Sequence, residues 1–223
     1  MVRMLRTLSP LVFASLVVTL ATALLVVSAP RAVAVTWSGA NCNGSHWAIS
    51  SWARSDAQAY AARADDEGYE WNGGCYKLND RDDTPNAPDS GGEGADCSGF
   101  VFKTWALRNT LGAAGRHYWE HEHEVHGPYY TWHYYSPADT YPFKLLNSKT
   151  YNATAYMDAF VYRNGDAGHI GMIYSEGSAG TDLIVEAKSD ALGTRIGWAD
   201  YRSQSAYQPV RRQGWTADCY PNC

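Results

Sequence analysis

The hydrophobic pattern of the chain changes once along its length, and that change limits the folds that the chain can adopt. Between residues 50 and 66, serines come first and apolar residues then recur near helical spacing. Gly68 follows and is expected to stop this helix. A second helix is predicted from about Cys97 to Thr110, with Asp96 as its N-cap and Gly112 beyond its end.

The last third of the chain contains short runs with the character of β-strands. Most of them are separated by Gly, Asn, Asp or Ser, which are typical of turns. The predicted strands are Ala159–Arg163, His169–Tyr174, Leu183–Ala187, Thr194–Trp198 and Tyr207–Arg211. Residues 75–95, dense in Asp, Asn, Pro and Gly, are expected to form a loop. Helices first and strands afterwards predict an α+β fold in which N-terminal helices pack on an antiparallel β-meander.

The first 34 residues have the pattern of a secretory signal peptide. Arg3 and Arg6 give a positive start, the run from Leu11 to Val27 is almost entirely apolar, and Ala32-Val33-Ala34 has the small residues that signal peptidases recognise. We expect cleavage after Ala34, which leaves residues 35–223 as a single secreted domain. A membrane anchor is the alternative, because the apolar run is nearly long enough to span a bilayer.

The charge balance narrows the range of partners. The predicted signal peptide holds three of the 18 basic residues and none of the 23 acidic ones, so 15 basic and 23 acidic residues give the mature chain a net charge of −8. An acidic chain of this kind is a poor candidate for holding nucleic acid or an anionic membrane. We expect a monomer with no nucleic-acid partner and, once the signal is removed, no membrane partner.

The chain has five cysteines, an odd number for a secreted protein. Four lie in loop-like or terminal contexts: Cys42, Cys75, Cys219 and Cys223. Cys97 alone lies at the start of a predicted helix. We therefore expect two disulfides among the outer four and a free thiol at Cys97. Three pairings are possible; the local option joins Cys219 to Cys223 and leaves Cys42 with Cys75.

Cys97 is the candidate nucleophile, and His169 is the candidate base. A sulfur in the first turn of a helix lies near unpaired backbone N–H groups, which are expected to lower the thiol pKa and to stabilise an oxyanion. His169 begins a predicted strand between Gly168 and Gly171. The alternatives are that Cys97 is only a buried core residue and that His169 is structural.

Glu186 is the candidate third residue, because it is the one acidic residue inside the apolar run Leu183–Ala187. If this run forms a hairpin with residues 169–174, Glu186 falls beside His169. A carboxylate there would fix the imidazole tautomer and stabilise its charged form. The alternative is an exposed charge on an edge strand.

These motifs resemble those of the NlpC-type cell-wall cysteine peptidases, a circularly rearranged branch of the papain-like superfamily. The resemblance covers about Trp52 to Arg211. It is carried by Asp96-Cys97-Ser98-Gly99-Phe100-Val101, Gly168-His169-Ile170-Gly171-Met172-Ile173-Tyr174, Ile184-Val185-Glu186-Ala187 and Gly68-Tyr69-Glu70-Trp71-Asn72-Gly73-Gly74. It implies a papain-like NlpC-type fold and a peptidase that hydrolyses peptidoglycan stem peptides, at a γ-D-glutamyl bond to a diamino acid, without a cofactor. It also implies that the secreted protein is extracellular or associated with a bacterial cell wall. The catalytic residues would be Cys97, His169 and Glu186, with Tyr69 assisting at the oxyanion.

The sequence departs from the family pattern in several places. The third position is commonly His, Asn or Gln, whereas Glu186 would carry a charge. Asn72 is an extra residue between Trp71 and the two glycines, and the loop before Cys97 is long. The Gly-Asp-Leu turn of the family appears only as Met157-Asp158-Ala159.

An insertion rich in histidine and aromatic residues, around residues 112–150, replaces a short substrate-facing segment of the family. Its histidines are His117, His121, His123, His126 and His133, and its aromatic residues include Trp119, Tyr129, Tyr130, Trp132, Tyr134 and Tyr135. A zinc site is one alternative, although Val125 breaks the His-Glu-x-x-His pattern, and we expect no metal. The insertion could support a zinc-dependent hydrolase, a non-catalytic wall- or glycan-binding protein, or an aromatic cover over the active-site cleft.

Overall fold

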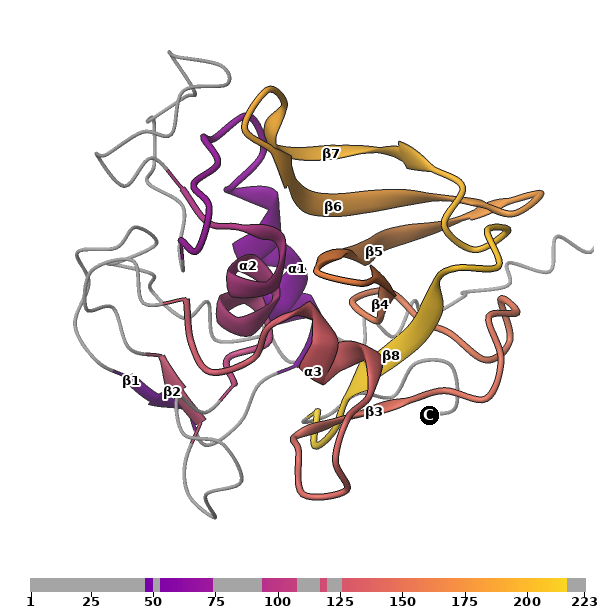
Figure 1. Ribbon diagram of the computed structural model, residues 1–223, viewed down its shortest axis with the longest axis horizontal. Coiled ribbons are helices and arrows are strands. Elements are labelled where there is room, and N and C mark those ends of the chain that lie inside the picture. Colours follow the sequence, from indigo (N-terminus) through magenta and orange to yellow (C-terminus); the bar gives the residue numbers. More distant parts are fainter. Residues whose placement is uncertain (1–46, 50–52, 74–93, 108–116, 120–125, 216–223) are drawn as a thin grey trace, which may run out of the picture. The chain divides into compact units, whose positions relative to one another are not determined.

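The computed structural model describes residues 47–49, 53–73, 94–107, 117–119 and 126–215, all within the unit Val35–Cys223 (Figure 1). The predicted signal peptide, most of the predicted loop 75–95 and the four outer cysteines lie outside the described residues. The helices are α1 (Arg54–Ala62), α2 (Cys97–Thr104) and α3 (Thr131–Tyr135). The strands are β1 (Trp47–Ile49), β2 (His117–Trp119), β3 (Phe143–Leu145), β4 (Ala159–Asn164), β5 (Ala167–Ser178), β6 (Thr181–Ser189), β7 (Gly193–Ala199) and β8 (Gln208–Arg212).

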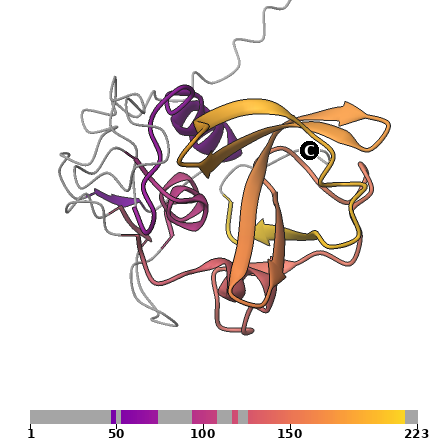
Figure 2. The same ribbon diagram turned by 45° about the horizontal axis from the view of Figure 1, so that its top comes forward.

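The fold is mixed α+β around a six-stranded antiparallel sheet (Figures 1 and 2). All five predicted strands are present, and β4 to β7 follow one another as the predicted meander. The last strand does not continue it: β8 returns to the far side of β4, giving the order β3-β8-β4-β5-β6-β7. The prediction of a simple meander is therefore wrong at β8. Strands β1 and β2 form a separate antiparallel pair.

The two predicted helices exist, but each is shorter than its pattern indicated. The first begins at Arg54 after Ala53 and ends at Ala62, well before Gly68. Asp96 is the N-cap of α2, as predicted, and accepts a hydrogen bond from Gly99 N at 2.7 Å. This helix ends at Thr104 rather than Thr110, because the chain leaves helical geometry at Ala106 (φ 47°).

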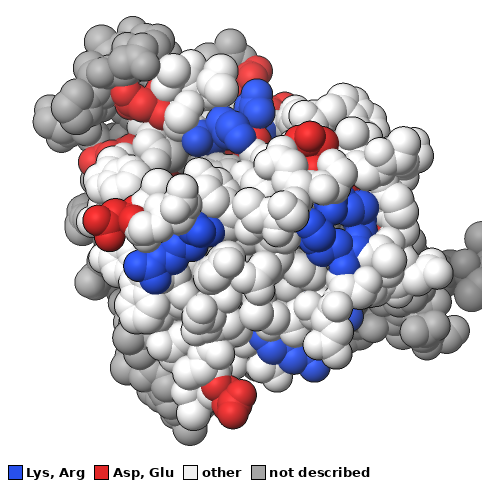
Figure 3. Space-filling model, turned by 45° about the vertical axis from the view of Figure 1, so that its right-hand side comes forward, with Lys and Arg blue, Asp and Glu red and all other residues white. Residues whose placement is uncertain are grey.

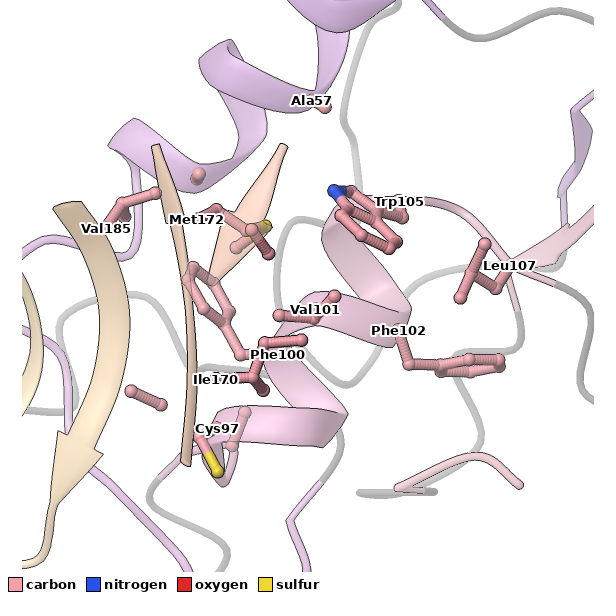
Figure 4. Packing of buried hydrophobic residues seen from close by; sticks show 14 of the residues in the cluster. Ala57, Cys97, Phe100, Val101, Phe102, Trp105, Leu107, Ile170, Met172 and Val185 are labelled. Atoms are coloured by element: carbon pink, nitrogen blue, oxygen red, sulfur yellow. The ribbon is translucent and has the colours of Figure 1, made fainter. Parts of the chain in front are cut away.

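The sheet buries apolar side chains on both faces because successive strand residues point to opposite sides. One core joins the sheet to α1 and α2, and part of it is shown in Figure 4. It includes Phe100, Val101, Trp105, Ile170, Met172 and Val185. A second, smaller core is formed by Phe160, Ile173, Ile184, Tyr201 and Tyr207. Helix α2 packs on β5 and β6, so its first residue lies beside the start of the strand that carries His169.

A buried carboxylate ties α1 to the sheet. Asp158 is fully buried and accepts hydrogen bonds from Arg54 Nη1 at 2.7 Å and from Arg211 Nη2 at 2.6 Å. It belongs to the Met157-Asp158-Ala159 segment, in which Met157 has a φ of 62°. A left-handed backbone is the conformation that glycine adopts most readily, so a non-glycine residue at this turn is strained.

The described surface carries mixed charge. On the face shown in Figure 3, Lys and Arg side chains form several small, separate groups, and most of the surface is uncharged. None of the described helices has both the length and the apolar character that a bilayer span requires.

Candidate active site

Cys97 is the first residue of α2 and a free thiol with 8% of its surface exposed. Its sulfur accepts hydrogen bonds from the backbone amides of Ile170, Ser98 and Cys97 itself. Figure 4 shows Cys97 beside the strand that carries Ile170. Strand β5 pairs with β6 only from Met172 onwards, where Met172 faces Val185. Ile170 precedes this paired part of β5, so the thiol lies beside a part of β5 that is not paired with β6. Because Ile170 follows His169 directly, this contact brings the sulfur next to the strand position that carries the candidate base.

A cavity of about 690 Å³ contains three of the four predicted site residues: Tyr69, Cys97 and His169. Its other lining residues come from the loop after α1, from β4 to β6 and from the segment before β8: Glu70, Trp71, Tyr162, Gly168, Lys188, Ser189, Asp190 and Tyr207. Trp71 is 78% exposed. The thiol and the imidazole therefore open onto one cavity, in which a substrate can reach both.

The fourth predicted residue, Glu186, does not line the cavity but contacts the ring of His169. Its Oε2 lies 2.6 Å from His169 Nε2, as the predicted hairpin implied. Gly171 makes this contact possible, because a Cβ there would lie 2.7 Å from Ile184 Cγ2 and 3.1 Å from Glu186 Oε2. With Nε2 held by the carboxylate, Nδ1 is the ring nitrogen that remains to serve the thiol.

Glu186 is charged, buried and heavily bonded. It is 1% exposed and lies on β6, an inner strand, so the alternative of an exposed edge-strand charge is wrong. Burial alone would raise its pKa, but hydrogen bonds from His169 and Tyr201 and the charge of Lys188 hold that pKa at about 2. Tyr201 Oη donates to Oε2 at 2.6 Å, and Arg195 Nη2 donates to Oε1 at 3.1 Å. The buried negative charge of Glu186 is thus balanced by neighbouring cations.

The expectation of a lowered thiol pKa is wrong. Burial is the largest cause and, together with the negative charge of Asp96, raises the pKa of Cys97 to about 12, although the three amides act in the opposite direction. The helix N-terminus was correctly identified, but the sequence does not show how deeply the sulfur is buried. The resting form of Cys97 is therefore the thiol, and its proton must pass to a base when it reacts.

Tyr69 reaches the cavity from a loop that packs tightly on the segment before Cys97. A parallel bridge joins Gly68 to Gly94, and a Cβ on Gly94 would lie 2.0 Å from Gly68 O. A Cβ on Gly73 would lie 2.2 Å from Gly94 O, so neither glycine can carry a side chain without moving the backbone. Burial, followed by the proximity of Cys97, raises the pKa of Tyr69, which keeps its hydroxyl protonated and able to donate.

The extra residue in this loop has a place in the site. Asn72 adopts a left-handed backbone (φ 67°), and its N–H donates to Asp96 Oδ2 at 3.1 Å. The Asp96 N–H donates in turn to Gly73 O at 3.1 Å. Asp96 therefore fastens the tyrosine loop to the start of α2 in addition to capping the helix.

His126, considered above only as one of the histidines of a possible zinc site, lies against the start of α2. His126 Nε2 lies 2.8 Å from Ser98 Oγ and 3.0 Å from Asp96 Oδ1. This is not the arrangement of a serine nucleophile: the carboxylate shares Nε2 with the hydroxyl instead of holding Nδ1, and Ser98 is buried. The sequence feature that indicates this contact is the pair of polar residues on either side of Cys97, Asp96 and Ser98, which need a hydrogen-bonding partner when they are buried.

The structure gives no support to a metal centre among the residues that it describes. No group of three His, Cys, Asp or Glu side chains within the described ranges could hold an ion. Of the tract's histidines, His126 and His133 are buried against other side chains. His121 and His123 lie outside the described residues, as does the side chain of His117.

Comparison with known proteins finds no matching family model and no matching curated protein. The arrangement of Cys97, His169 and Glu186 around one cavity is therefore the basis on which a function can be proposed. In chemical terms it is a thiol at a helix N-terminus, an imidazole on the adjoining strand and a carboxylate that orients the imidazole.

Proposed function

We propose that the chain is a secreted bacterial cysteine peptidase with a papain-like, NlpC-type fold that hydrolyses amide bonds in peptidoglycan stem peptides. One observation carries the proposal: the free thiol of Cys97 shares a cavity with His169, whose Nε2 lies 2.6 Å from the buried Glu186 carboxylate. A nucleophile, a base and a residue that orients the base are the three parts that thiol hydrolysis needs.

The reaction begins with proton transfer from the thiol to His169 Nδ1, because the raised thiol pKa makes the neutral SH the resting form. The sulfur then attacks the scissile carbonyl carbon, and the carbonyl oxygen becomes an oxyanion. The Cys97 amide and the Tyr69 hydroxyl donate hydrogen bonds to this oxyanion. The imidazolium protonates the leaving amine, the C–N bond breaks and a thioester remains. His169 next takes a proton from water, which attacks the thioester and releases the acid and the thiol.

Glu186 supports both proton transfers. Its contact with Nε2 fixes the ring so that Nδ1 is the nitrogen that exchanges protons with the substrate side. Its negative charge stabilises the imidazolium that forms in each half of the reaction. Because Arg195 and Lys188 lie within 3.1 Å and 3.6 Å of Oε1, the carboxylate remains ionised while it does so.

The cavity suits a peptide that carries both carboxylates and amines. Its lining includes one basic side chain, Lys188, and two acidic side chains, Glu70 and Asp190, with the exposed ring of Trp71 beside them. Stem peptides carry free carboxylates and the amine of a diamino acid. The γ-D-glutamyl bond to the diamino acid is the bond that the family resemblance implies.

The test is digestion of purified peptidoglycan by the mature wild-type protein and by Cys97→Ala, each with and without a chelator. We expect the wild type to release stem-peptide fragments with or without chelator and Cys97→Ala to release none, as measured by mass spectrometry. Release by both proteins, or by neither, would contradict the proposal. Loss of release only in the presence of chelator would instead indicate a metal-dependent hydrolase.

A further inference from the structure

The environment of His126 determines where its protons lie. Its Nδ1 is 2.9 Å from the carbonyl oxygen of Gly127, which can only accept a hydrogen bond, so Nδ1 carries a proton. Its Nε2 faces two oxygens, Asp96 Oδ1 at 3.0 Å and Ser98 Oγ at 2.8 Å. A bare nitrogen lone pair directed at a carboxylate oxygen would be repelled by it.

A second proton, on Nε2, satisfies every group in this cluster. The Nε2–H then donates to the oxygens of Asp96 and Ser98, and the Ser98 hydroxyl donates to Asp96 Oδ1 at 3.1 Å. All three side chains are buried, so solvent does not screen the charges. Burial lowers the pKa of His126, but its contact with the Asp96 carboxylate outweighs that effect and raises the pKa above its ordinary value.

Asp96 lies next to Cys97 in the chain, and its negative charge disfavours the ionised, thiolate form of Cys97. Asp96 is the second-largest influence that raises the pKa of the Cys97 thiol, after burial. The same carboxylate is fixed in place, because it caps α2 through Gly99 N and holds the tyrosine loop through Asn72 N. Helix α2 therefore needs the Asp96 carboxylate as its cap, although the negative charge of that carboxylate disfavours the thiolate form of Cys97.

We propose that His126, as an imidazolium bound to Asp96 and Ser98, compensates the Asp96 charge beside the nucleophile and is a positioning residue for Cys97. His126 makes no contribution to the cavity lining and acts through the start of α2. The inference rests on the proposed function, since it assigns His126 a part in generating the thiolate that this function uses.

Several other groups face His126 and contribute to its titration. Lys103 of α2 opposes its positive charge, and His133 of α3 is electrostatically coupled to it. Tyr130 stacks on its ring, with centroids 4.3 Å apart. Gly127, which accepts the Nδ1–H bond, has a φ of 83° and packs on the ring of Phe102, where a Cβ would come within 2.6 Å. These contacts fix the ring so that Nε2 meets Asp96.

The test measures alkylation of Cys97 by iodoacetamide across pH, which reports thiolate formation without any substrate. In His126→Gln, the uncompensated carboxylate raises the thiol pKa, and we expect alkylation at neutral pH to slow about three- to tenfold, as for a shift of about one pH unit. In the wild type, the logarithm of the rate should rise less steeply where His126 loses its proton. That flattened step should be absent from His126→Gln, which retains His169.

Two further variants separate this role from a general structural one. His133→Gln is the matched control, because His133 is buried in the same tract and its Nδ1 bonds Tyr130 N rather than Asp96, so its alkylation profile should resemble that of the wild type. In a chain carrying Asp96→Asn, adding His126→Gln should cause no further slowing, because the charge to be compensated is gone.

The possible outcomes are distinct. Equal profiles for wild type and His126→Gln, or equal slowing by His126→Gln with Asp and with Asn at position 96, would overturn the inference. Unfolding would be recognised by faster alkylation and by a loss of the circular dichroism signal. If both appear in His126→Gln, the inference is tested by comparing the alkylation rates of Asp96→Asn and of the double variant Asp96→Asn with His126→Gln. If the alkylation profiles are as expected but the wild type releases no stem peptides, the role of His126 is supported and the proposed peptidase activity is rejected.

Discussion

Two buried histidine–carboxylate pairs flank the same thiol, and they differ in what else the carboxylate contacts. In the His169–Glu186 pair, the nitrogen and oxygen are 2.6 Å apart, and Arg195 and Lys188 also lie within 4 Å of the carboxylate. In the His126–Asp96 pair, the separation is 3.0 Å, and the other described partners of the carboxylate are backbone amides and a hydroxyl.

The difference decides what each histidine can do. Glu186 is balanced by other cations, so His169 can gain and lose a proton without leaving a buried charge uncompensated. Asp96 depends on His126 for its compensation, so that proton is held in place. The His169–Glu186 pair, which borders the cavity, is suited to proton transfer. The His126–Asp96 pair, which does not border the cavity, is suited to holding a positive charge beside Asp96. Two substitutions in the cavity pair test this contrast, and two elsewhere provide comparisons, in order of decreasing expected effect on activity.

Replacing the cavity histidine should have the largest effect. In His169→Gln, the amide can keep a hydrogen bond to Glu186 but cannot accept the thiol proton. We expect release of stem peptides to fall about 10³-fold, as for loss of a general base and acid. The measurement is the initial rate of release, with the thermal unfolding midpoint as a control for folding. A loss no greater than that in His126→Gln would remove the contrast between the pairs.

Replacing the carboxylate should have a smaller effect on the rate and a characteristic effect on stability. In Glu186→Gln, we expect turnover to fall on the order of 10²-fold, because the ring loses its orientation and the imidazolium its counter-charge. The folded pKa of Glu186, about 2, lies below its ordinary value of 4.5. Its contribution to the free energy of unfolding, about 3 kcal/mol, is therefore fully present above pH 4.5 and is lost as pH falls towards 2.

Urea unfolding of wild type and Glu186→Gln at several pH values between 2 and 7 measures this contribution. The gap between the two proteins should be constant near neutrality and should narrow steadily below pH 4.5. A gap that widened in acid would show that the carboxylate is not stabilised by its partners in the folded state.

The oxyanion donor should contribute less than the base. In Tyr69→Phe, the ring still fills its place in the loop but the hydroxyl is lost. We expect kcat to fall about tenfold to a hundredfold with a smaller change in KM, since this donor acts on the charge that develops in the transition state. Steady-state kinetics on a soluble stem peptide provides the measurement. A change confined to KM would assign Tyr69 to substrate binding instead.

A third buried carboxylate, remote from the site, provides the control with the smallest effect on activity. Asp182 bonds Arg202 through both of its oxygens, at 2.8 and 2.9 Å, and neither residue lines the cavity. Asp182→Asn should lower the free energy of unfolding by about 3 kcal/mol, because it leaves the buried guanidinium with only one described ion pair, the longer contact to Glu176 Oε1 at 3.5 Å, while kcat/KM stays unchanged at a temperature where the variant is folded. Urea unfolding and the same kinetic assay measure the two quantities.

The parts of the fold that the sequence predicts are those specified by neighbouring residues. The N-cap at Asp96 and the β5–β6 hairpin each depend on a short stretch of chain. The hairpin alone brings Glu186 to His169, with Gly171 leaving room between them. The contact between His169 and Glu186 could therefore be predicted from the sequence, whereas the approach of Cys97 and Tyr69 to His169 depends on the packing of separate elements.

The parts that the sequence does not predict depend on distant contacts. β8 leaves the meander for the far side of β4, and nothing in its own five residues distinguishes that edge from the edge of β7. The end of α2 is likewise set from a distance, since Arg212 Nε donates to the Trp105 carbonyl at 2.6 Å. The high pKa of Cys97 follows from its burial, which the packing of α2 on two strands produces.

The two contacts of Asp158 also bear on the order of folding. Asp158 accepts hydrogen bonds from Arg54 near the beginning and from Arg211 near the end, so α1 and β8 are both joined to the segment before β4. Contacts between residues so far apart in the chain form late and slowly. A chain truncated before β8 would keep Cys97, His169 and Glu186, but it would lose Arg211 and the strand that lies between β3 and β4.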